Sequence, residues 1–146
     1  MTRYVIEPEL ALQLAEQRAK VPAGHKLLAP TLLRSQVLAQ LYAEVVRGSM
    51  NRKEAELRLD YLRGLQIRLL GDRVLQRVAW DIAIQLEWKD TFTAEYLALT
   101  KLQADALVTG NGWLSLAASK FVPVVTLEQL LTERSGAATR IAPPNE

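Results

Sequence analysis

Oxygen-bearing side chains stand at four junctions between the predicted elements of this chain. Glu7 and Glu9 follow the apolar run "RYVI", and Gln36 lies near the start of a helix that follows "LLA". Thr93 opens another helix, and Asn111 comes just after the apolar run "DALVT". In parallel sheets the functional crevice lies beyond the carboxyl ends of the strands. These carboxylate, amide and hydroxyl groups could therefore face one crevice.

Other kinds of chemistry are excluded by composition. The chain has no cysteine and a single histidine, His25. Disulfides, thiolate zinc sites, cysteine nucleophiles and multi-histidine metal clusters are therefore ruled out. His25 lies in "VPAGHKLLAP", where proline and glycine mark a loop, and we expect it to be a solvated loop residue rather than a general base.

Strand-like and helix-like segments alternate along the chain. The patterns predict strands at 3–6, 27–29, 65–70, 105–109 and 122–126. They predict helices at 9–18, 31–47, 52–64, 72–86, 93–102 and 114–119, and a last helical turn that Thr126 and Gln129 cap. Alternating strands and helices favour a parallel sheet with right-handed crossovers. The predicted fold is an α/β protein, a three-layer α/β/α sandwich with a mostly parallel central sheet.

Length and composition indicate one domain. The chain has 146 residues, of which 49% are hydrophobic and 23% charged, which is typical of a globular protein. We expect a domain over residues 1–133 and a mobile tail over 134–146. No apolar run approaches the ~20 residues of a membrane span. Glu7 and Glu9 interrupt the region where a secretory signal has its apolar stretch, so a cytoplasmic location and no membrane partner are expected.

Positive charge is concentrated in one segment, residues 47–79. It holds eight basic residues and four acidic ones, a local charge of +4. The basic residues are Arg47, Arg52, Lys53, Arg58, Arg63, Arg68, Arg73 and Arg77. Such an excess could contact RNA phosphates, although charges spaced along helices are more often a solvated face. The three tryptophans, Trp80, Trp88 and Trp113, are interpreted as core or interface aromatics rather than base-stacking platforms.

Several blocks of the chain, in order, match one known family. They are "YVIEPELAL", "LLAPTLLRSQVLAQL", "TFTAEYLALTKLQADALVTGNGWL" and "VPVVTLEQLL". With these blocks the chain resembles PIN domains, and most closely the VapC-type ribonuclease toxins of bacterial toxin–antitoxin pairs. The resemblance covers about Arg3 to Leu131. It implies a PIN-like fold and a site that uses Mg²⁺ or Mn²⁺ to cut single-stranded RNA.

The resemblance places the family's four acidic positions at Glu7, Gln36, Thr93 and Asn111, where the family usually has Asp, Glu, Asp and Asp. Glu7 is the one anion left, with Glu9 as a second carboxylate that could help it bind a metal weakly. Neutral oxygens attract a desolvated Mg²⁺ far less than carboxylates do. The nearby acids do not replace the lost charges, because the helical offsets of Asp90 and Glu95 turn them away and Asp105 precedes its strand.

Each neutral position also has a structural interpretation. Gln36 suits a surface or amide-bonding role, Thr93 could be a helix N-cap, and Asn111 suits a turn between two glycines because Asn and Gly tolerate positive φ. The leading hypothesis is a catalytically impaired or inactive VapC-like protein that acts as a binding or regulatory module. The alternative is an active Mg²⁺- or Mn²⁺-dependent endoribonuclease toxin using Glu7 with neutral co-ligands. The partners that the resemblance implies are a second copy in a homodimer, an antitoxin-like peptide on the helices at 31–47 and 52–63, and RNA.

Overall fold

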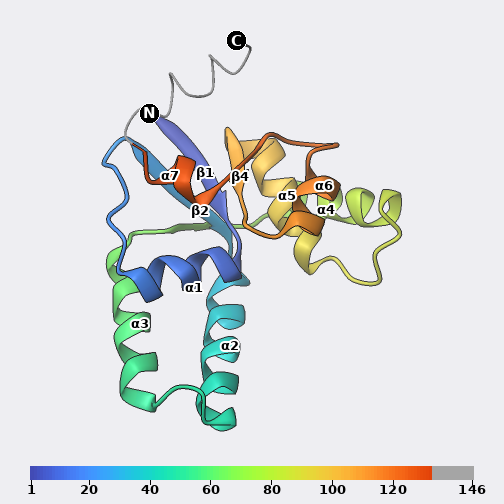
Figure 1. Cartoon of the computed structure of the whole chain (residues 1–146). Helices are drawn as coiled ribbons and strands as arrows, with labels where there is room; N and C mark the ends of the chain where they lie inside the picture. The colour runs from blue at the N-terminus through green and yellow to red at the C-terminus, as the bar shows by residue number, and fades with distance from the viewer. Residues whose placement is uncertain (133–146) are drawn as a thin grey trace.

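A computed structural model gives the structure of the chain and describes residues 1–132 (Figure 1). The expected tail over 134–146 lies outside the described residues. The strands are β1 (Thr2–Ile6), β2 (His25–Pro30), β3 (Arg68–Leu70), β4 (Ala106–Val108) and β5 (Val124–Val125). The helices are α1 (Pro8–Gln17), α2 (Leu33–Arg47), α3 (Arg52–Gly64), α4 (Arg73–Gln85), α5 (Phe92–Gln103), α6 (Gly112–Ala118) and α7 (Leu127–Leu130).

The five strands form one sheet in the order β3-β2-β1-β4-β5, and every pairing is parallel. Helices α1, α2 and α3 cover one face, and α4, α5 and α6 cover the other (Figure 1). This is the expected three-layer α/β/α sandwich, and the expectation of a mostly parallel sheet is confirmed. No helix within residues 1–132 has the length and apolar character needed to span a membrane.

The core lies around the central strand β1. Val5 and Ile6 are fully buried, and Val5 pairs with Leu28 on one side and Leu107 on the other. Helix α5 is buried along most of its length, and its Ala94 and Ala98 let it approach the sheet closely. Burying each large apolar side chain contributes roughly 1.5–3 kcal/mol. The rigid centre of the sheet therefore fixes the carboxyl ends of β1 and β4, next to which the predicted site residues lie.

Two expectations about local structure are wrong, one about His25 and one about the strand at 65–70. His25 is buried in β2, where its Nδ1–H donates a hydrogen bond of 2.6 Å to the carbonyl oxygen of Leu130. Strand β2 begins at His25 because that residue already pairs with Thr2 of β1. Of the tryptophans expected in the core or at an interface, Trp80 and Trp113 are not core residues, since 64% and 63% of their surfaces are exposed. The predicted strand at 65–70 shortens to Arg68–Leu70, because Gln66 has a left-handed φ of 59°.

Candidate functional site

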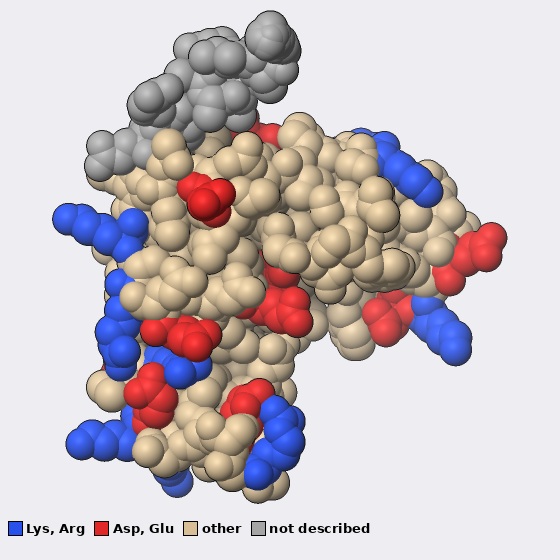
Figure 2. Space-filling view, viewed as in Figure 1, with Lys and Arg blue, Asp and Glu red and all other residues tan. Residues whose placement is uncertain are grey.

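A crevice opens at the carboxyl ends of β1 and β4, where helices α1, α2, α5 and α6 begin. Its volume is about 340 Å³, and all four positions that the resemblance singled out line it, as does Glu9. These residues are Glu7, Gln36, Thr93 and Asn111. In Figure 2 acidic side chains lie in the notch between α1 and the part of the molecule formed by α5 and α6. The tertiary structure thus brings together residues up to 104 positions apart in the sequence.

Glu7 is the buried carboxylate of this crevice, with 6% of its surface exposed. It is the N-cap of α1, and its Oε1 accepts hydrogen bonds from the backbone N–H groups of Glu9 at 2.7 Å and Leu10 at 3.3 Å. Its Oε2 accepts a hydrogen bond of 3.0 Å from the Thr109 hydroxyl. The sequence favours this cap, because Pro8 suits the first helical position and an acidic side chain suits a helix start. Both oxygens of Glu7 are therefore held by the protein.

Burial dominates the electrostatics of Glu7. Desolvation raises the pKa of this carboxyl above its ordinary value of 4.5. The hydrogen bonds from Thr109, Glu9 and Leu10 act in the opposite direction, and the negative charge of Glu9 adds a small further increase. No Lys or Arg is among the residues of the described chain that line this crevice.

Asn111 is a helix cap rather than a turn residue. Its Oδ1 accepts a hydrogen bond of 3.1 Å from the N–H of Leu114, and its own N–H donates to the Thr109 hydroxyl at 3.1 Å. The expected turn does not use the positive φ that Asn and Gly tolerate, because Asn111 has φ −88° and neither Gly110 nor Gly112 has a positive φ. Helix α6 starts at Gly112, two residues before the predicted start. Thr109 therefore joins the cap of α1 to the cap of α6.

Gln36 and Thr93 line the same crevice from helices α2 and α5. Gln36 accepts a hydrogen bond of 2.6 Å at its Oε1 from the hydroxyl of Tyr96, which supports the amide-bonding interpretation. Burial raises the pKa of Tyr96, and the charges of Glu7 and Glu95 raise it further, so the phenol stays a neutral donor. Thr93 is inside helix α5, whose N-cap is Thr91, so the expectation that Thr93 caps this helix is wrong.

The other acids near these positions have separate roles. Asp105 is at the amino ends of the strands, where its Oδ2 accepts a hydrogen bond of 2.8 Å from the backbone N–H of Arg3. Asp90 precedes α5, and its Oδ1 accepts from the N–H of Phe92 at 3.1 Å. Neither Asp90 nor Glu95 is among the residues that line the crevice. The expectation that these acids do not replace the missing charges agrees with their positions.

The donor set fits a divalent metal ion poorly. Of the four family positions, Glu7, Gln36 and Asn111 already accept hydrogen bonds from protein N–H or O–H groups at their side-chain oxygens. Within residues 1–132 no group of three or more His, Cys, Asp or Glu side chains is arranged to hold a metal ion. Mg²⁺ demands near-octahedral oxygen ligands and releases its waters reluctantly. The crevice is instead a hydrogen-bonded polar surface.

Two residues that line the crevice, Tyr96 and Gln40, were not singled out from the sequence, and neither was the role of the buried Thr109. Thr109 and Tyr96 supply the hydroxyls that bind Glu7 and Gln36, and Gln40 lines the crevice beside Gln36. The sequence could have indicated Gln40, because residues four apart on a helix lie on the same face and Gln40 is one turn after Gln36. The roles of Thr109 and Tyr96 had no such signal, because their partners are 102 and 60 residues away.

Trp113 gives the crevice an aromatic wall. It lines the crevice at the start of α6, and its ring centroid lies 5.7 Å from that of Trp88 at a tilt of 34°. Trp88 is half-buried and packs against the core. The pair therefore joins the loop after α4 to helix α6 and leaves the Trp113 ring accessible beside amide and carboxylate groups.

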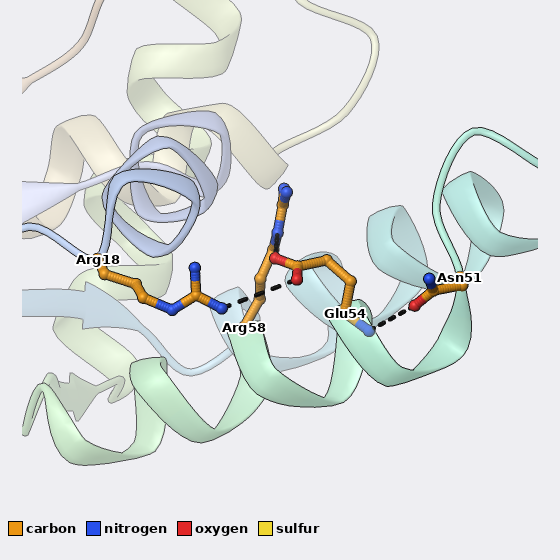
Figure 3. Close-up of polar contacts among 4 residues, drawn as sticks. All are labelled: Arg18, Asn51, Glu54 and Arg58. Atoms are coloured by element: carbon orange, nitrogen blue, oxygen red, sulfur yellow. Dashed lines mark hydrogen bonds and ion pairs between the residues drawn. The ribbon is translucent and has the colours of Figure 1, made fainter.

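The basic segment is separate from the crevice. Four of its arginines form ion pairs with acids on the same helices, namely Arg47, Arg52, Arg58 and Arg63. Lys and Arg side chains gather along the edge on which α3 lies, away from the notch (Figure 2). In Figure 3 Glu54 lies between Arg58, at 2.8 Å, and Arg18 of α1, at 3.7 Å. These four arginines are therefore paired within their own helices, and the ion pair of Glu54 with Arg18 links α3 to the end of α1.

Comparison with known proteins identifies the fold. No protein-family model and no curated protein matches the chain. The chain is similar to the crystal structure of PAE2754 from Pyrobaculum aerophilum, with a TM-score of 0.69 and 17% sequence identity. The match covers 93% of this chain and 98% of that chain. At this identity the similarity establishes the architecture, and the activity has to be argued from the crevice itself.

Proposed function

We propose that this chain is a PIN-type protein, similar to VapC toxins, in which the metal site has become a structural hydrogen-bond network. In this proposal it is a cytoplasmic binding or regulatory module with little or no ribonuclease activity. The observation that carries the proposal is the bonding of Glu7, the one acidic residue at the four positions that the resemblance singles out. One oxygen of its carboxylate caps α1 and the other binds the Thr109 hydroxyl. The neutral Gln36, Thr93 and Asn111 supply no charge to hold a cation.

The surfaces of the molecule support binding roles. The crevice presents amide groups and the exposed Trp113 ring but no cationic side chain among the described residues that line it, so it suits neutral polar or aromatic groups better than phosphates. Helix α2 exposes Leu38, Tyr42 and Val46, which are spaced four residues apart and form one apolar stripe. Such a stripe is the kind of surface that accepts an amphipathic helix, so it supports the expectation of an antitoxin-like peptide.

A metal titration joined to a cleavage assay tests this proposal. We expect calorimetry with Mg²⁺ or Mn²⁺ to give no saturable binding in the millimolar range, and we expect no metal-dependent cleavage of single-stranded RNA. Glu7→Gln is the matched control, because it removes the charge and keeps the size of the side chain. Metal binding together with cleavage that Glu7→Gln abolishes would overturn the proposal.

Restoring the acids gives a second test. The variant Gln36→Glu, Thr93→Asp and Asn111→Asp adds three carboxylates to a crevice that already gathers these positions. We expect it to bind Mn²⁺ at least about tenfold more tightly than the wild-type chain, since anionic oxygens are the ligands that such cations prefer. Equal binding by both proteins would show that the loss of charge is not what impairs the site.

The convergence of these positions favours one alternative, an active endoribonuclease. Glu7, Glu9, Gln36, Thr93 and Asn111 all line one crevice, so a metal held by the two carboxylates with neutral co-ligands would meet the right residues. In this function Glu7 would bind the metal through an oxygen lone pair that its present hydrogen bonds leave free, since a carboxylate has about four acceptor sites. The cleavage assay with Glu7→Gln and Glu9→Gln distinguishes it, because only this alternative predicts activity that both variants reduce.

A further inference from the structure

Two amide side chains of the crevice are held by their oxygens and leave their nitrogens unused. The Oδ1 of Asn111 accepts from the N–H of Leu114, and the Oε1 of Gln36 accepts from the Tyr96 hydroxyl. The NH₂ group of each amide forms no hydrogen bond with another residue in the described part of the chain. An amide nitrogen carries two donors and no acceptor. The crevice wall therefore offers two oriented donor groups.

Glu9 provides the matching acceptor. Its carboxylate lines the crevice and has neither an ion pair nor a hydrogen bond within residues 1–132. This negative charge disfavours phosphates and other anions, because no Lys or Arg is among the described residues that line the crevice. Ammonium and guanidinium groups carry donors only, so the two amide NH₂ groups cannot bind them. The set fits a neutral ligand that both donates and accepts hydrogen bonds.

Trp113 adds a flat apolar surface to these polar groups. Its ring is 63% exposed and lines the crevice, and Trp88 supports it at a centroid distance of 5.7 Å. A sugar ring has C–H groups on its faces that pack on an aromatic ring, and hydroxyls at its edge that donate and accept. A ligand of this kind satisfies the aromatic wall and the polar groups at the same time.

The polar groups come from four separate helices. Glu9 is on α1, Gln36 and Gln40 are on α2, Thr93 is on α5, and Asn111 caps α6. Hydroxyls around a sugar ring point in several directions, whereas the polar atoms of a nucleobase lie in one plane. The volume of about 340 Å³ is within the range of small-molecule sites, roughly 300–1,000 Å³. Both features favour a sugar over a stacked base.

We propose that the crevice binds a neutral saccharide, with a sugar ring packed on Trp113. The hydroxyls of this sugar accept from the NH₂ groups of Gln36 and Asn111 and donate to the carboxylate of Glu9. The inference rests on the proposed function, since it takes the crevice to be a binding site without a metal, and it names the class of ligand.

Sugars that differ in charge test the class of ligand. Calorimetry at neutral pH measures binding of neutral mono- and disaccharides of glucose, galactose, mannose and N-acetylglucosamine to the wild-type chain. We expect at least one of them to bind with a dissociation constant of about 1 mM. The amino sugar and the uronic acid that correspond to this sugar should bind at least about tenfold more weakly, because each adds a charge that the crevice does not match.

Four variants locate the site. Trp113→Ala should weaken binding at least about tenfold, whereas Trp80→Ala, which removes a tryptophan of 64% exposure from α4, is the matched control and should leave it unchanged. Asn111→Asp and Gln36→Glu keep the oxygens that already accept hydrogen bonds but replace the donors, so each should also weaken binding at least about tenfold. Far-UV circular dichroism checks that all variants are folded.

Three results would overturn the inference. The first is that no neutral saccharide of the panel binds at concentrations up to about 50 mM. The second is that Trp113→Ala and Asn111→Asp leave the binding unchanged. The third is that uridine or adenosine binds in the crevice and no saccharide does.

The two proposals fail in different ways. Metal binding together with cleavage that depends on Glu7 overturns the proposed function. A chain that binds neither metal nor saccharide leaves the proposed function standing and overturns only the inference about the sugar.

Discussion

Two glutamates at the starts of helices, Glu7 and Glu54, show how surroundings decide what a carboxylate does. Glu7 caps α1 from a buried position between β1 and β4, and burial raises its pKa. Glu54 is in the first turn of α3, where Asn51 is the cap, and the hydrogen bond from Arg58 is the main cause that lowers its pKa. Glu54 has two arginines beside it, and Glu7 has hydroxyl and backbone donors instead.

The contrast bears on the proposal that the crevice binds cations poorly. A carboxylate near the surface that is paired with arginine keeps its charge at a small cost in free energy. A buried carboxylate without a cation loses its hydration, and three hydrogen bonds replace that hydration only in part. Glu7 is therefore adapted to hold protein donors in place. The following predictions test this difference between the two glutamates, from the largest expected effect to the smallest.

The largest effect is expected from Glu7→Ala. This change leaves two backbone N–H groups and the Thr109 hydroxyl without their acceptor in a buried place. Loss of the cap and of these bonds should lower the free energy of unfolding by about 3 kcal/mol, measured by urea denaturation. Glu7→Gln is the control, because its amide oxygen can still accept from the N–H groups of Glu9 and Leu10 and its amide nitrogen can donate to the Thr109 hydroxyl. Equal stability of the wild type and Glu7→Ala would show that Glu7 is not a structural cap.

Thr109→Val is expected to have the next largest effect. It keeps the shape of the side chain but removes the donor to Glu7 and the acceptor of the Asn111 N–H. We expect a loss of about 2 kcal/mol at neutral pH. The pKa of Glu7 should also increase further, because the Thr109 hydrogen bond lowers it in the wild type. A change in stability without a change in this pKa would contradict the assigned contact.

The pH dependence of stability should differ between the wild type and Glu7→Gln. Because folding raises the pKa of Glu7, the folded state binds the proton more tightly than the unfolded state. The wild type should therefore lose stability relative to Glu7→Gln as pH rises from about 4.5 through the raised pKa, and the difference should then stay constant. Glu54 and other groups are common to both proteins and cancel. If the wild type instead gained stability relative to Glu7→Gln as pH rises, the folded protein would favour the charged form of Glu7.

The smallest effect is expected from Arg58→Met. Removing the guanidinium should raise the pKa of Glu54 toward its ordinary value of 4.5, which an NMR titration of this carboxyl measures. The lowered pKa of Glu54 stabilises the fold above about pH 4.5, and this contribution is lost as pH falls through the pKa of the folded state. The free energy of unfolding of the variant should therefore depend less on pH in acid than that of the wild type. Its stability should change less than that of Thr109→Val, since ion pairs near the surface contribute little.

The fold was predictable from local patterns. Pro8 after a strand, Asn51 and Asp72 before helices, and Thr126 with Gln129 gave correct helix starts, because a cap acts on N–H groups two or three residues away. Short apolar runs placed all five strands. The failures at 65–70 and at Asn111 arose where two local signals compete, since Asn is favoured both in turns and at helix caps.

The candidate site was predictable in position but not in chemistry. The resemblance and the strand ends placed Glu7, Gln36, Thr93 and Asn111 at one crevice, and they do line it. The partners of these side chains are distant in sequence, so no spacing could indicate them. Thr109 is 102 residues from Glu7, and Tyr96 is 60 residues from Gln36. The burial of His25 was missed for the same reason, since Leu130 is 105 residues away.

The sequence by itself determined which elements form, their order along the chain and the neutral side chains at Gln36, Thr93 and Asn111, because these depend on residue types and short spacings. Only the tertiary structure decided that Glu7 is buried and bound by Thr109, and that Trp113 lines the same crevice as Glu9. The physical reason is that desolvation and long-range hydrogen bonds depend on which surfaces meet when the sheet and helices pack.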